Sequence, residues 1–342
     1  MSEQNAVSSN TARVVTFGEA MIRMTPPNYE RLERSISLGL TVGGAELNTA
    51  VALACLDLPA SFVTVLPDNA LGRLVDRQAR GSRVDTSHIQ WVPDSEGRMG
   101  LYFLEEGVDP RPSSVTYDRA GSAIARVAPG TFDWPALLDG AAGIHISGIT
   151  PAVSDNCRAE TRAAMQAANA ARVPVFFDLN YRSKLWSEHE ARACFTELIP
   201  FVDILFASRA GLRTFYGLDG DHEEIMAAAR ERLGVAVVAL TKKKERGSRG
   251  LKLSAMALGP SGEVVETEGK EVEVIDRLGG GDAFAGGFIA GYLENPENLE
   301  RAVSLGIAAS ALKHTMPGDF LCATRAEIEA ATSAESAGVL QR

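Results

Sequence analysis

The sequence predicts an α/β protein with a doubly wound, mostly parallel β-sheet flanked by helices. The main observation is an alternation of short apolar runs with longer helix-like segments along most of the chain. Parallel strands that are buried on both faces give such continuous apolar runs, and each crossover between them usually contains a helix. The second observation is the composition, because 45% hydrophobic and 23% charged residues are ordinary for a folded globular chain of 342 residues.

The strand-like runs are bounded by turn residues and recur in order along the chain. The first is RVVTFGEAMIRM from residue 13, followed by SFVTVL, GIHISGI, VPVFFDLN, VDILFAS and VAVVALT. Between them lie helix-like segments such as NTAVALACL, CRAETRAAMQAANAA and EEIMAAARERL. The polar ends lack this pattern. We therefore expect one folded domain over residues 12–331, with flexible tails at residues 1–11 and 332–342.

Two stretches interrupt the alternation, residues 23–42 and residues 91–119. The first carries Pro26, Pro27 and many charges, and the second alternates polar with apolar residues around WVPDSEGRMGLYFLEE. Such alternation suits strands that are exposed on one face. We expect the two stretches to form a small inserted β-sheet lid over the carboxyl edge of the main sheet, where open α/β sheets bind ligands. Ordinary edge hairpins are the alternative.

Charge and cysteine content argue against several classes of protein. With 34 Lys and Arg against 44 Asp and Glu, the net charge of −10 disfavours broad binding to nucleic acid. The four cysteines are far apart and form no CxxC pair, so neither a zinc site nor a redox motif is indicated. The chain shows no apolar signal core and no stretch of about 20 apolar residues, so we expect a cytoplasmic protein without a membrane partner.

The run EVIDRLGGGDAFAGGFIAGYL carries the clearest chemistry. Gly279, Gly280 and Gly281 lead into Asp282 and a helix-like segment. Without Cβ atoms, the backbone amides of such a turn can converge on a phosphate, and the helix dipole adds to the same field. Asp282 could then accept the proton of an attacking hydroxyl, as phosphoryl transfer requires. Taken alone, GGGD could equally be a glycine C-cap followed by an aspartate N-cap.

This segment resembles the GAGD signature of the ribokinase-like carbohydrate kinases, with Gly280 in place of the usual alanine. TVGGAELNTAVALACL resembles the family's other signature, a glycine pair that feeds a helix facing the sugar, although the pair alone could be a simple turn. The resemblance covers residues 13 to about 330 and implies a ribokinase-like fold and an ATP-dependent sugar kinase. It implies that Asp282 is the catalytic base and that the amides of Gly279, Gly280 and Gly281 form the anion hole. It also implies that the sugar is contacted by Gly43, Gly44, Asn48 and Asp282.

Three further segments bear on the kind of sugar. GLYFLEE, SVTYDRAGSA and FFDLNYRSKLW each resemble their counterparts in the kinases of 2-keto-3-deoxygluconate. That resemblance implies that Tyr102, Tyr117, Arg119 and Arg182 contact the keto acid, whose product would be its 6-phosphate. A sugar acid needs a cation for its carboxylate, and arginine suits that role. The alternative is that both arginines are solvated surface charges.

On the nucleotide side, the resemblance implies ATP with Mg²⁺ that is bound mainly through the ATP phosphates, and no metal ligand from the protein. It leaves room for a monovalent cation. The residues that it places near the nucleotide are Ser208, Gly247, Gly250, Gly279 and Gly281. Lys313 and His314, in KHTMPGDF, could also lie near the nucleotide or form a charge pair at a helix end.

Two nucleotide-side segments depart from the family pattern. TKKKER precedes Gly247 like a short cationic insertion, and its lysines could approach ATP phosphates or form a solvated charge run. Where relatives commonly have an Asn-x-x-Glu element, this chain has Ser208 and Gly211. Asp178 is not taken as a metal ligand, because a carboxylate at a strand end can simply cap the next turn.

Two other functions stay open at this point. One is a kinase of another sugar, such as fructose or 2-keto-3-deoxygalactonate, since the orientation of one hydroxyl is not legible from residue types. The other is a non-catalytic sensor of sugar acids, although the intact Asp282 argues against it. The expected partners are a small sugar acid, ATP and further copies of the chain in a homo-oligomer.

Overall fold

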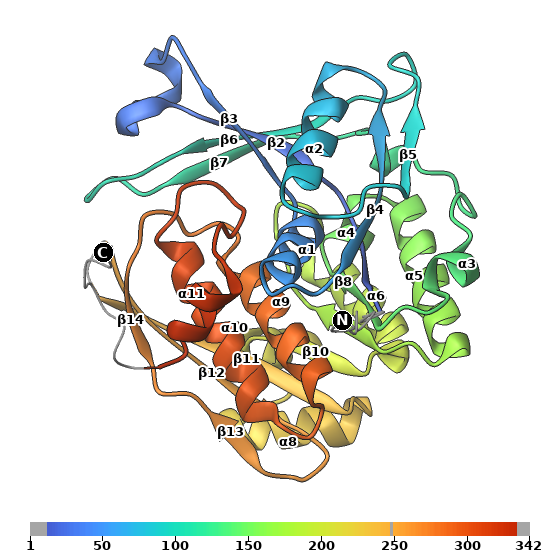
Figure 1. The fold of residues 1–342 in the computed structure, drawn as a ribbon, viewed down its shortest axis with the longest axis vertical. Helices are drawn as coiled ribbons and strands as arrows, with labels where there is room; N and C mark the ends of the chain where they lie inside the picture. The colour runs from blue at the N-terminus through green and yellow to red at the C-terminus, as the bar shows by residue number, and fades with distance from the viewer. Residues whose placement is uncertain (1–11, 247–248, 334–342) are drawn as a thin grey trace, which may run out of the picture.

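The computed structural model of the protein describes residues 12–246 and 249–333. A ten-stranded sheet lies at its centre, and a separate four-stranded sheet projects from one end of the molecule (Figure 1). The strand order of the large sheet is β13-β12-β11-β10-β9-β8-β1-β4-β5, with β14 beside β12. Its strands are β1 (Val14–Phe17), β4 (Ala60–Pro67), β5 (Ile89–Val92), β8 (Gly143–Ser147), β9 (Val175–Asp178), β10 (Ile204–Ala207), β11 (Val237–Arg246), β12 (Gly250–Leu258), β13 (Val264–Glu266) and β14 (Lys270–Glu273).

The strands from β11 to β5 run parallel, which confirms the predicted mostly parallel sheet. The remaining strands pair antiparallel with β12 at one edge. Because parallel strands end at the same edge, the loops that follow β1, β8, β9 and β10 meet there. Asp178, the last residue of β9, reaches this carboxyl edge.

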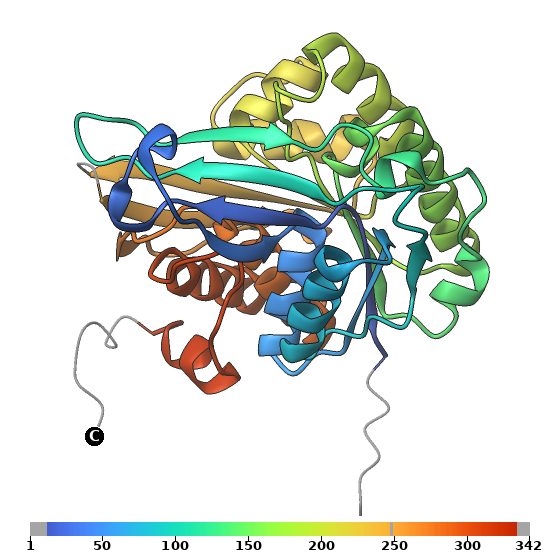
Figure 2. The same ribbon diagram turned by 90° about the horizontal axis from the view of Figure 1, so that it is seen from above.

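Helices cover both faces of the large sheet (Figure 2). One apolar core joins the sheet to α1 (Ala45–Cys55), α2 (Ala70–Gly81), α9 (Gly280–Glu294), α10 (Leu299–His314) and α11 (Arg325–Ala330). A second core lies on the opposite face, against α3 (Trp134–Leu138), α4 (Thr150–Val153), α5 (Asp155–Ala171), α6 (Glu188–Leu198), α7 (Arg209–Tyr216) and α8 (His222–Leu233). Within the described residues, no helix has the length and apolar character needed to cross a membrane.

Local sequence signals set several helix starts. Ser187 and Glu190 form a capping box at α6, and Asp221 and Glu224 form another at α8. In each box, the N-cap side chain accepts a hydrogen bond from a free helix amide while the glutamate accepts one from the N-cap amide. These caps fix the helices that begin near the carboxyl edge, where the strand loops meet.

The small sheet has the order β3-β2-β6-β7. Its strands are β2 (Met21–Thr25), β3 (Gly39–Gly43), β6 (Gly100–Glu105) and β7 (Ser114–Asp118), and two short 3₁₀ turns, η1 (Pro27–Tyr29) and η2 (Leu32–Arg34), lie between β2 and β3. The stretches 23–42 and 91–119 thus supply most of this sheet. One boundary differs, because Trp91 and Val92 pair with β4 and belong to the large sheet.

Candidate active site

A pocket lies where the small sheet meets the carboxyl edge of the large sheet. Its volume is about 600 Å³, counting the open mouth. Eight residues that the sequence singled out line it: Gly44, Asn48, Tyr102, Tyr117, Arg119, Arg182, Gly279 and Asp282. The fold therefore brings together both glycine motifs and both arginines, although they are spread over most of the chain.

Asp282 lies in the first turn of α9, beside α1. Its Oδ2 accepts a hydrogen bond of 2.7 Å from Asn48 Nδ2, and its backbone oxygen accepts one of 3.3 Å from Thr49 Oγ1. Burial raises the pKa of Asp282 to about 6, while the hydrogen bond from Asn48 opposes that shift. The carboxylate is therefore ionised at neutral pH and more basic than an ordinary aspartate, which suits proton transfer.

Packing requires two of the three glycines that precede Asp282. Gly279 has a φ of 78°, and a Cβ there would lie 2.0 Å from the backbone oxygen of Asp319. A Cβ at Gly280 would lie 2.1 Å from Cε1 of His314, so this chain has no room for the alanine that is usual in the resembled signature. At Gly281 a Cβ would meet nothing within 4 Å. The third glycine thus leaves open space in which an anion can approach the backbone.

Lys313 and His314, at the last turn of α10, pack against this turn. Lys313 is fully buried, its Nζ donates to Met316 O at 3.1 Å, and its Cε would lie 3.2 Å from a Cβ at Gly279. Burial lowers the pKa of His314 to about 4, and its Nδ1 lies 2.6 Å from Ser310 O. His314 is therefore neutral at physiological pH, so the cation of this pair is Lys313.

The two arginines of the pocket differ in their partners. Arg119 forms an ion pair with Glu19, which is 1% exposed and also accepts a hydrogen bond of 2.6 Å from Ser122 Oγ. Arg182 is exposed, and its guanidinium forms no ion pair with any residue that the structure describes. Arg182 is therefore the less compensated cation for a ligand carboxylate, whereas part of the charge of Arg119 is offset within the protein.

The two tyrosines form the small-sheet wall of the pocket. Their ring centroids lie 6.0 Å apart, and the guanidinium carbon of Arg119 lies 5.6 Å from the ring centroid of Tyr117. Tyr102 Oη donates to Asp319 Oδ2 at 2.6 Å. Burial and the charge of Asp319 raise the pKa of Tyr102, so its phenol stays protonated. Gly43 does not line the pocket but packs behind this wall, because a Cβ there would lie 2.4 Å from Asp319 Oδ2.

Two polar residues of the pocket were missed from the sequence, Lys184 and Asp319. Lys184 Nζ donates to Val115 O at 2.6 Å and lies 5.8 Å from the ring centroid of Tyr117, so it ties the loop after β9 to β7. Each lies only a few residues from a residue that the sequence analysis singled out, Arg182 or His314. Proximity to those motifs was the only signal available for them.

The residues predicted on the nucleotide side are more scattered. Ser208 caps α7, and its Oγ accepts a hydrogen bond of 3.0 Å from Gly211 N. Gly250 begins β12, where a Cβ would lie 2.2 Å from Arg246 O. Gly247 lies outside the described residues. Neither Ser208 nor Gly250 lines the pocket that holds Asp282.

The segment TKKKER, expected to be a short cationic insertion, forms the end of a strand. It continues β11 to Arg246, and each of its residues pairs with one on β12. Lys242 forms an ion pair with Glu266. Lys243 is exposed in area, yet partial desolvation by the surrounding protein lowers its pKa, and the carboxylates of Asp282 and Asp178 oppose that shift. One lysine of the run therefore lies in the electric field of the candidate base.

Asp178 also belongs to this field. Burial and the charge of Asp282 raise its pKa to about 7. Its Oδ1 accepts a hydrogen bond of 3.1 Å from Asn180 N, which is the turn-capping role that its position at the strand end suggested. Over residues 12–246 and 249–333, no group of three or more His, Cys, Asp or Glu side chains is arranged to hold a metal ion.

A second cavity, of about 1880 Å³ counting its open mouth, lies between β14 and α10. Its lining includes Glu273 of β14 and Ser304, Ile307 and Ala311 of α10. Ala311 and Thr315, which both line this cavity, lie on either side of His314 along the chain, but no residue of the glycine turn lines it.

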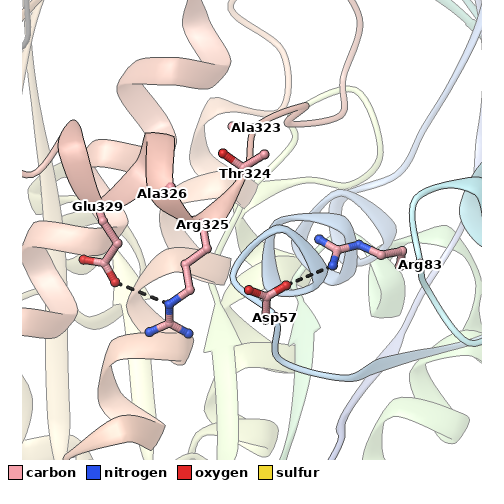
Figure 3. A pocket seen from close by; sticks show the side chains of 7 residues that line it. All are labelled: Asp57, Arg83, Ala323, Thr324, Arg325, Ala326 and Glu329. Atoms are coloured by element: carbon pink, nitrogen blue, oxygen red, sulfur yellow. Dashed lines mark hydrogen bonds and ion pairs between the residues drawn. The ribbon is translucent and has the colours of Figure 1, made fainter.

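Another pocket lies between α11 and the turns that follow α1 and α2 (Figure 3). Its charged side chains pair with each other: Asp57 Oδ1 lies 2.9 Å from Arg83 Nη1, and Arg325 Nε lies 3.4 Å from Glu329 Oε1. None of the residues singled out from the sequence lines it. We assign it no part in the chemistry.

The doubly wound sheet, the separate small sheet and the carboxylate behind a glycine turn together define a ribokinase-like architecture. The pfkB family carbohydrate kinase model matches residues 11–336. The chain therefore belongs to the pfkB family of carbohydrate kinases, which confirms the resemblance and the enzyme class inferred from the sequence.

Individual relatives are similar over nearly the whole chain. A 2-dehydro-3-deoxygalactonokinase from Haloferax volcanii is 38% identical over 96% of this chain and 99% of its own. A 2-dehydro-3-deoxygluconokinase from Thermoproteus tenax is 31% identical over 90% of this chain and 89% of its own. The crystal structure of 2-dehydro-3-deoxygluconokinase from Thermotoga maritima has a TM-score of 0.90 at 36% identity, covering 94% of this chain and 98% of its own.

Proposed function

We propose that the protein transfers the γ-phosphoryl group of ATP to the terminal hydroxyl of a 2-dehydro-3-deoxy sugar acid. The observation that carries this proposal is that one pocket contains a basic aspartate, a glycine turn and the guanidinium of Arg182, which pairs with no carboxylate among the described residues. A neutral sugar offers no partner for that charge, whereas a carboxylate does. The relatives with more than 30% identity, which are named for such acids, support the same substrate class.

In the proposed mechanism, Asp282 accepts the proton of the attacking hydroxyl. The hydroxyl oxygen forms a bond to the γ-phosphorus, and the bond from that phosphorus to the oxygen bridging to the β-phosphate breaks, so that ADP leaves. The amides of Gly279, Gly280 and Gly281 donate to the transferring group, and the dipole of α9 stabilises its negative charge. Asn48 holds the Asp282 carboxylate in place through the 2.7 Å hydrogen bond.

Mg²⁺ would neutralise phosphate charge during this transfer. The described residues contain no ready-made cluster for it, so a hydrated ion held mainly by the ATP phosphates fits this site. Asp178 and Asp282 are the carboxylates to which water ligands of the ion could donate hydrogen bonds. A dependence on a monovalent cation stays a prediction, tested by replacing potassium with choline in the assay.

The cavity between β14 and α10 is our candidate site for the nucleoside part of ATP. From Ile307 to His314, α10 spans about 10 Å at 1.5 Å per residue, a reach comparable to a triphosphate chain. Phosphates at the glycine turn would therefore leave the base beside Ser304 and Ile307. Gly250 pairs with Glu273, which lines this cavity, so its predicted nucleotide contact fits here. Ser208 lines a different pocket, beside Asp178 and Thr241, so its contact with the nucleotide stays a prediction.

Among acids, both the gluconate-derived and the galactonate-derived keto acids remain candidates, since relatives named for each are similar to this chain. Fructose lacks the carboxylate that Arg182 would bind. A non-catalytic sensor would not need a basic aspartate behind an anion hole. The test is ATP consumption, in a coupled assay, with both keto acids, fructose and ribose. We expect a preference for the acids, and equal or better use of fructose would contradict the proposal.

We also propose that the protein forms a homo-oligomer through the small sheet. Five large hydrophobic side chains in its segments are exposed: Tyr29, Ile36, Leu40, Val108 and Tyr117, the last of which also lines the pocket. Clustered exposed apolar residues often mark an interface. Sedimentation of the protein and of an Ile36→Glu, Leu40→Glu variant would test this, and an unchanged monomeric mass in both would contradict it.

A further inference from the structure

A buried cluster of charges lies behind the pocket and takes no part in the mechanism above. Its centre is Arg23 on β2, whose side chain is 3% exposed. Nη1 of Arg23 lies 2.6 Å from Asp276 Oδ2 and 3.0 Å from Asp319 Oδ1, and Nε donates to Thr25 Oγ1 at 2.9 Å. Nη2 lies 3.5 Å from Oε1 of Glu106. One guanidinium of the small sheet thus bridges two buried carboxylates from the C-terminal third of the chain.

The first of these carboxylates holds the lead-in to the glycine turn. Oδ1 of Asp276 accepts a hydrogen bond of 3.0 Å from Leu278 N, and Oδ2 accepts one of 3.0 Å from Gly318 N. Leu278 directly precedes Gly279, the N-cap of α9. The position of the Asp276 side chain therefore sets where the anion-hole amides begin.

The second carboxylate supports the turn from the other side. The backbone oxygen of Asp319 packs so closely on Gly279 that a Cβ would lie 2.0 Å away. Its Oδ2 accepts the hydrogen bond from Tyr102, a wall residue of the sugar pocket. Arg23 therefore connects β2, the Tyr102 wall and both sides of the glycine turn within one hydrogen-bonded cluster.

The cluster depends on the guanidinium for its charge balance. Asp276 and Asp319 are buried side by side, and Lys313 is the other cation whose charge acts on them. Removing one partner of a buried ion pair leaves an uncompensated charge, which is strongly destabilising for the local arrangement. Without Arg23 the two carboxylates would repel, and Asp276 would release or reorient the Leu278 amide.

We propose that Arg23 is a positioning residue that couples the seating of the small sheet to the geometry of the anion hole. This proposal rests on the proposed function, because it assigns the glycine turn to the transferring phosphate. It adds that the turn is held in its phosphate-binding form by the positive charge of Arg23, which lies on β2 of the small sheet. Phosphoryl transfer would then be efficient only when the small sheet lies in place over the sugar.

The test compares Arg23→Ala and Arg23→Lys with the wild-type protein. Small misplacements of catalytic groups are costly, so we expect Arg23→Ala to lower kcat by about tenfold to a hundredfold while KM for the keto acid changes by less than about threefold. Guanidinium ion at millimolar concentration should restore part of that kcat with saturation, since it can occupy the vacated cavity. The kcat of Arg23→Lys should lie between those of the wild type and Arg23→Ala. A loss confined to KM, or a lower melting temperature with full kcat and no rescue, would overturn the proposal.

Arg13→Ala is the control, because Arg13 is another arginine near the start of the chain, is partly buried, and its Nη2 donates to Leu137 O at 2.8 Å, outside the pocket. It should keep kcat and show no rescue. Hydrogen exchange of the amides of residues 278–281 separates this proposal from the proposed function, since it needs no turnover. Faster exchange there in Arg23→Ala, reversed by guanidinium ion, supports the coupling even if the wild type phosphorylates another sugar. Unchanged exchange overturns it.

Discussion

Replacing Asp282 by Asn removes the proposed base while keeping the shape of its side chain. The 2.7 Å hydrogen bond from Asn48 can be retained, because the amide oxygen of the substituted side chain can accept it in place of Oδ2. The backbone bond from Thr49 is unaffected. Sugar binding should therefore persist. A positioned general base contributes about 10²- to 10⁴-fold, so kcat should fall by that factor.

The pH dependence of kcat/KM tests the role of Asp282 independently. Because burial raises the pKa of Asp282 to about 6, the protonated and inactive form accumulates below that pH. We expect kcat/KM of the wild type to fall as the pH drops through about 6, by about tenfold per unit well below it. The Asp282→Asn variant should lack this acid limb.

The assay is coupled ADP release at saturating ATP, with the sugar Kd of the variant measured by calorimetry. Comparable Kd values for variant and wild type show that the pocket is intact. If the variant keeps more than about a tenth of the wild-type kcat, Asp282 is not the base. An acid limb that survives in the variant would assign that titration to another group, with Asp178 the first candidate because its pKa is raised to about 7.

Three further predictions concern the small sheet, the substrate and stability. Binding of the sugar acid should protect residues 23–42 and 91–119 from hydrogen exchange, because closure excludes water from phosphoryl transfer; unchanged exchange in both would contradict a lid. Replacing Arg182 or Arg119 by Met should lower kcat/KM for the keto acid by about tenfold to a hundredfold and change fructose turnover far less. The Arg119→Met variant should also be less stable, because the buried carboxylate of Glu19 loses its cation. Equal losses for acid and neutral sugar would remove the acid assignment. Burial raises the pKa of Glu46 to about 7 from 4.5, so the folded state binds its proton more tightly and stability falls as pH rises across that range. Glu46→Gln should flatten that fall in thermal unfolding between pH 5 and 8, and an unchanged slope would rule out Glu46 as its source.

Much of the fold could be predicted from the sequence, because the sequence signals for its strands and helices are local. The run VPVFFDLN became β9 and ended at Asp178, and the glycine pair fed α1 as expected. The Trp91 boundary was misjudged because a short edge strand on the large sheet has the same alternation as a strand of the small one. The strand formed by TKKKER could not be predicted, because its run of charges hides the pairing, which is set by its neighbour β12.

The residues of the candidate site could be predicted only where they belong to a contiguous motif. Asp282 and its glycines lie in one short run, and the family resemblance pointed to the tyrosines and arginines. The ion pair of Arg119 with Glu19 and the bridge from Arg23 to Asp276 join residues 100 and 253 positions apart. Such contacts leave no periodicity or spacing in the sequence, since only the tertiary fold brings the partners together.

The most direct test of the central claim is the ³¹P NMR spectrum of the product formed from ATP and a 2-dehydro-3-deoxy sugar acid. We predict one new phosphate monoester per ADP, with its phosphorus coupled to the two protons of the terminal carbon, and no such signal with Asp282→Asn. ADP formation accompanied only by inorganic phosphate, or an ester on a different carbon, would contradict the account.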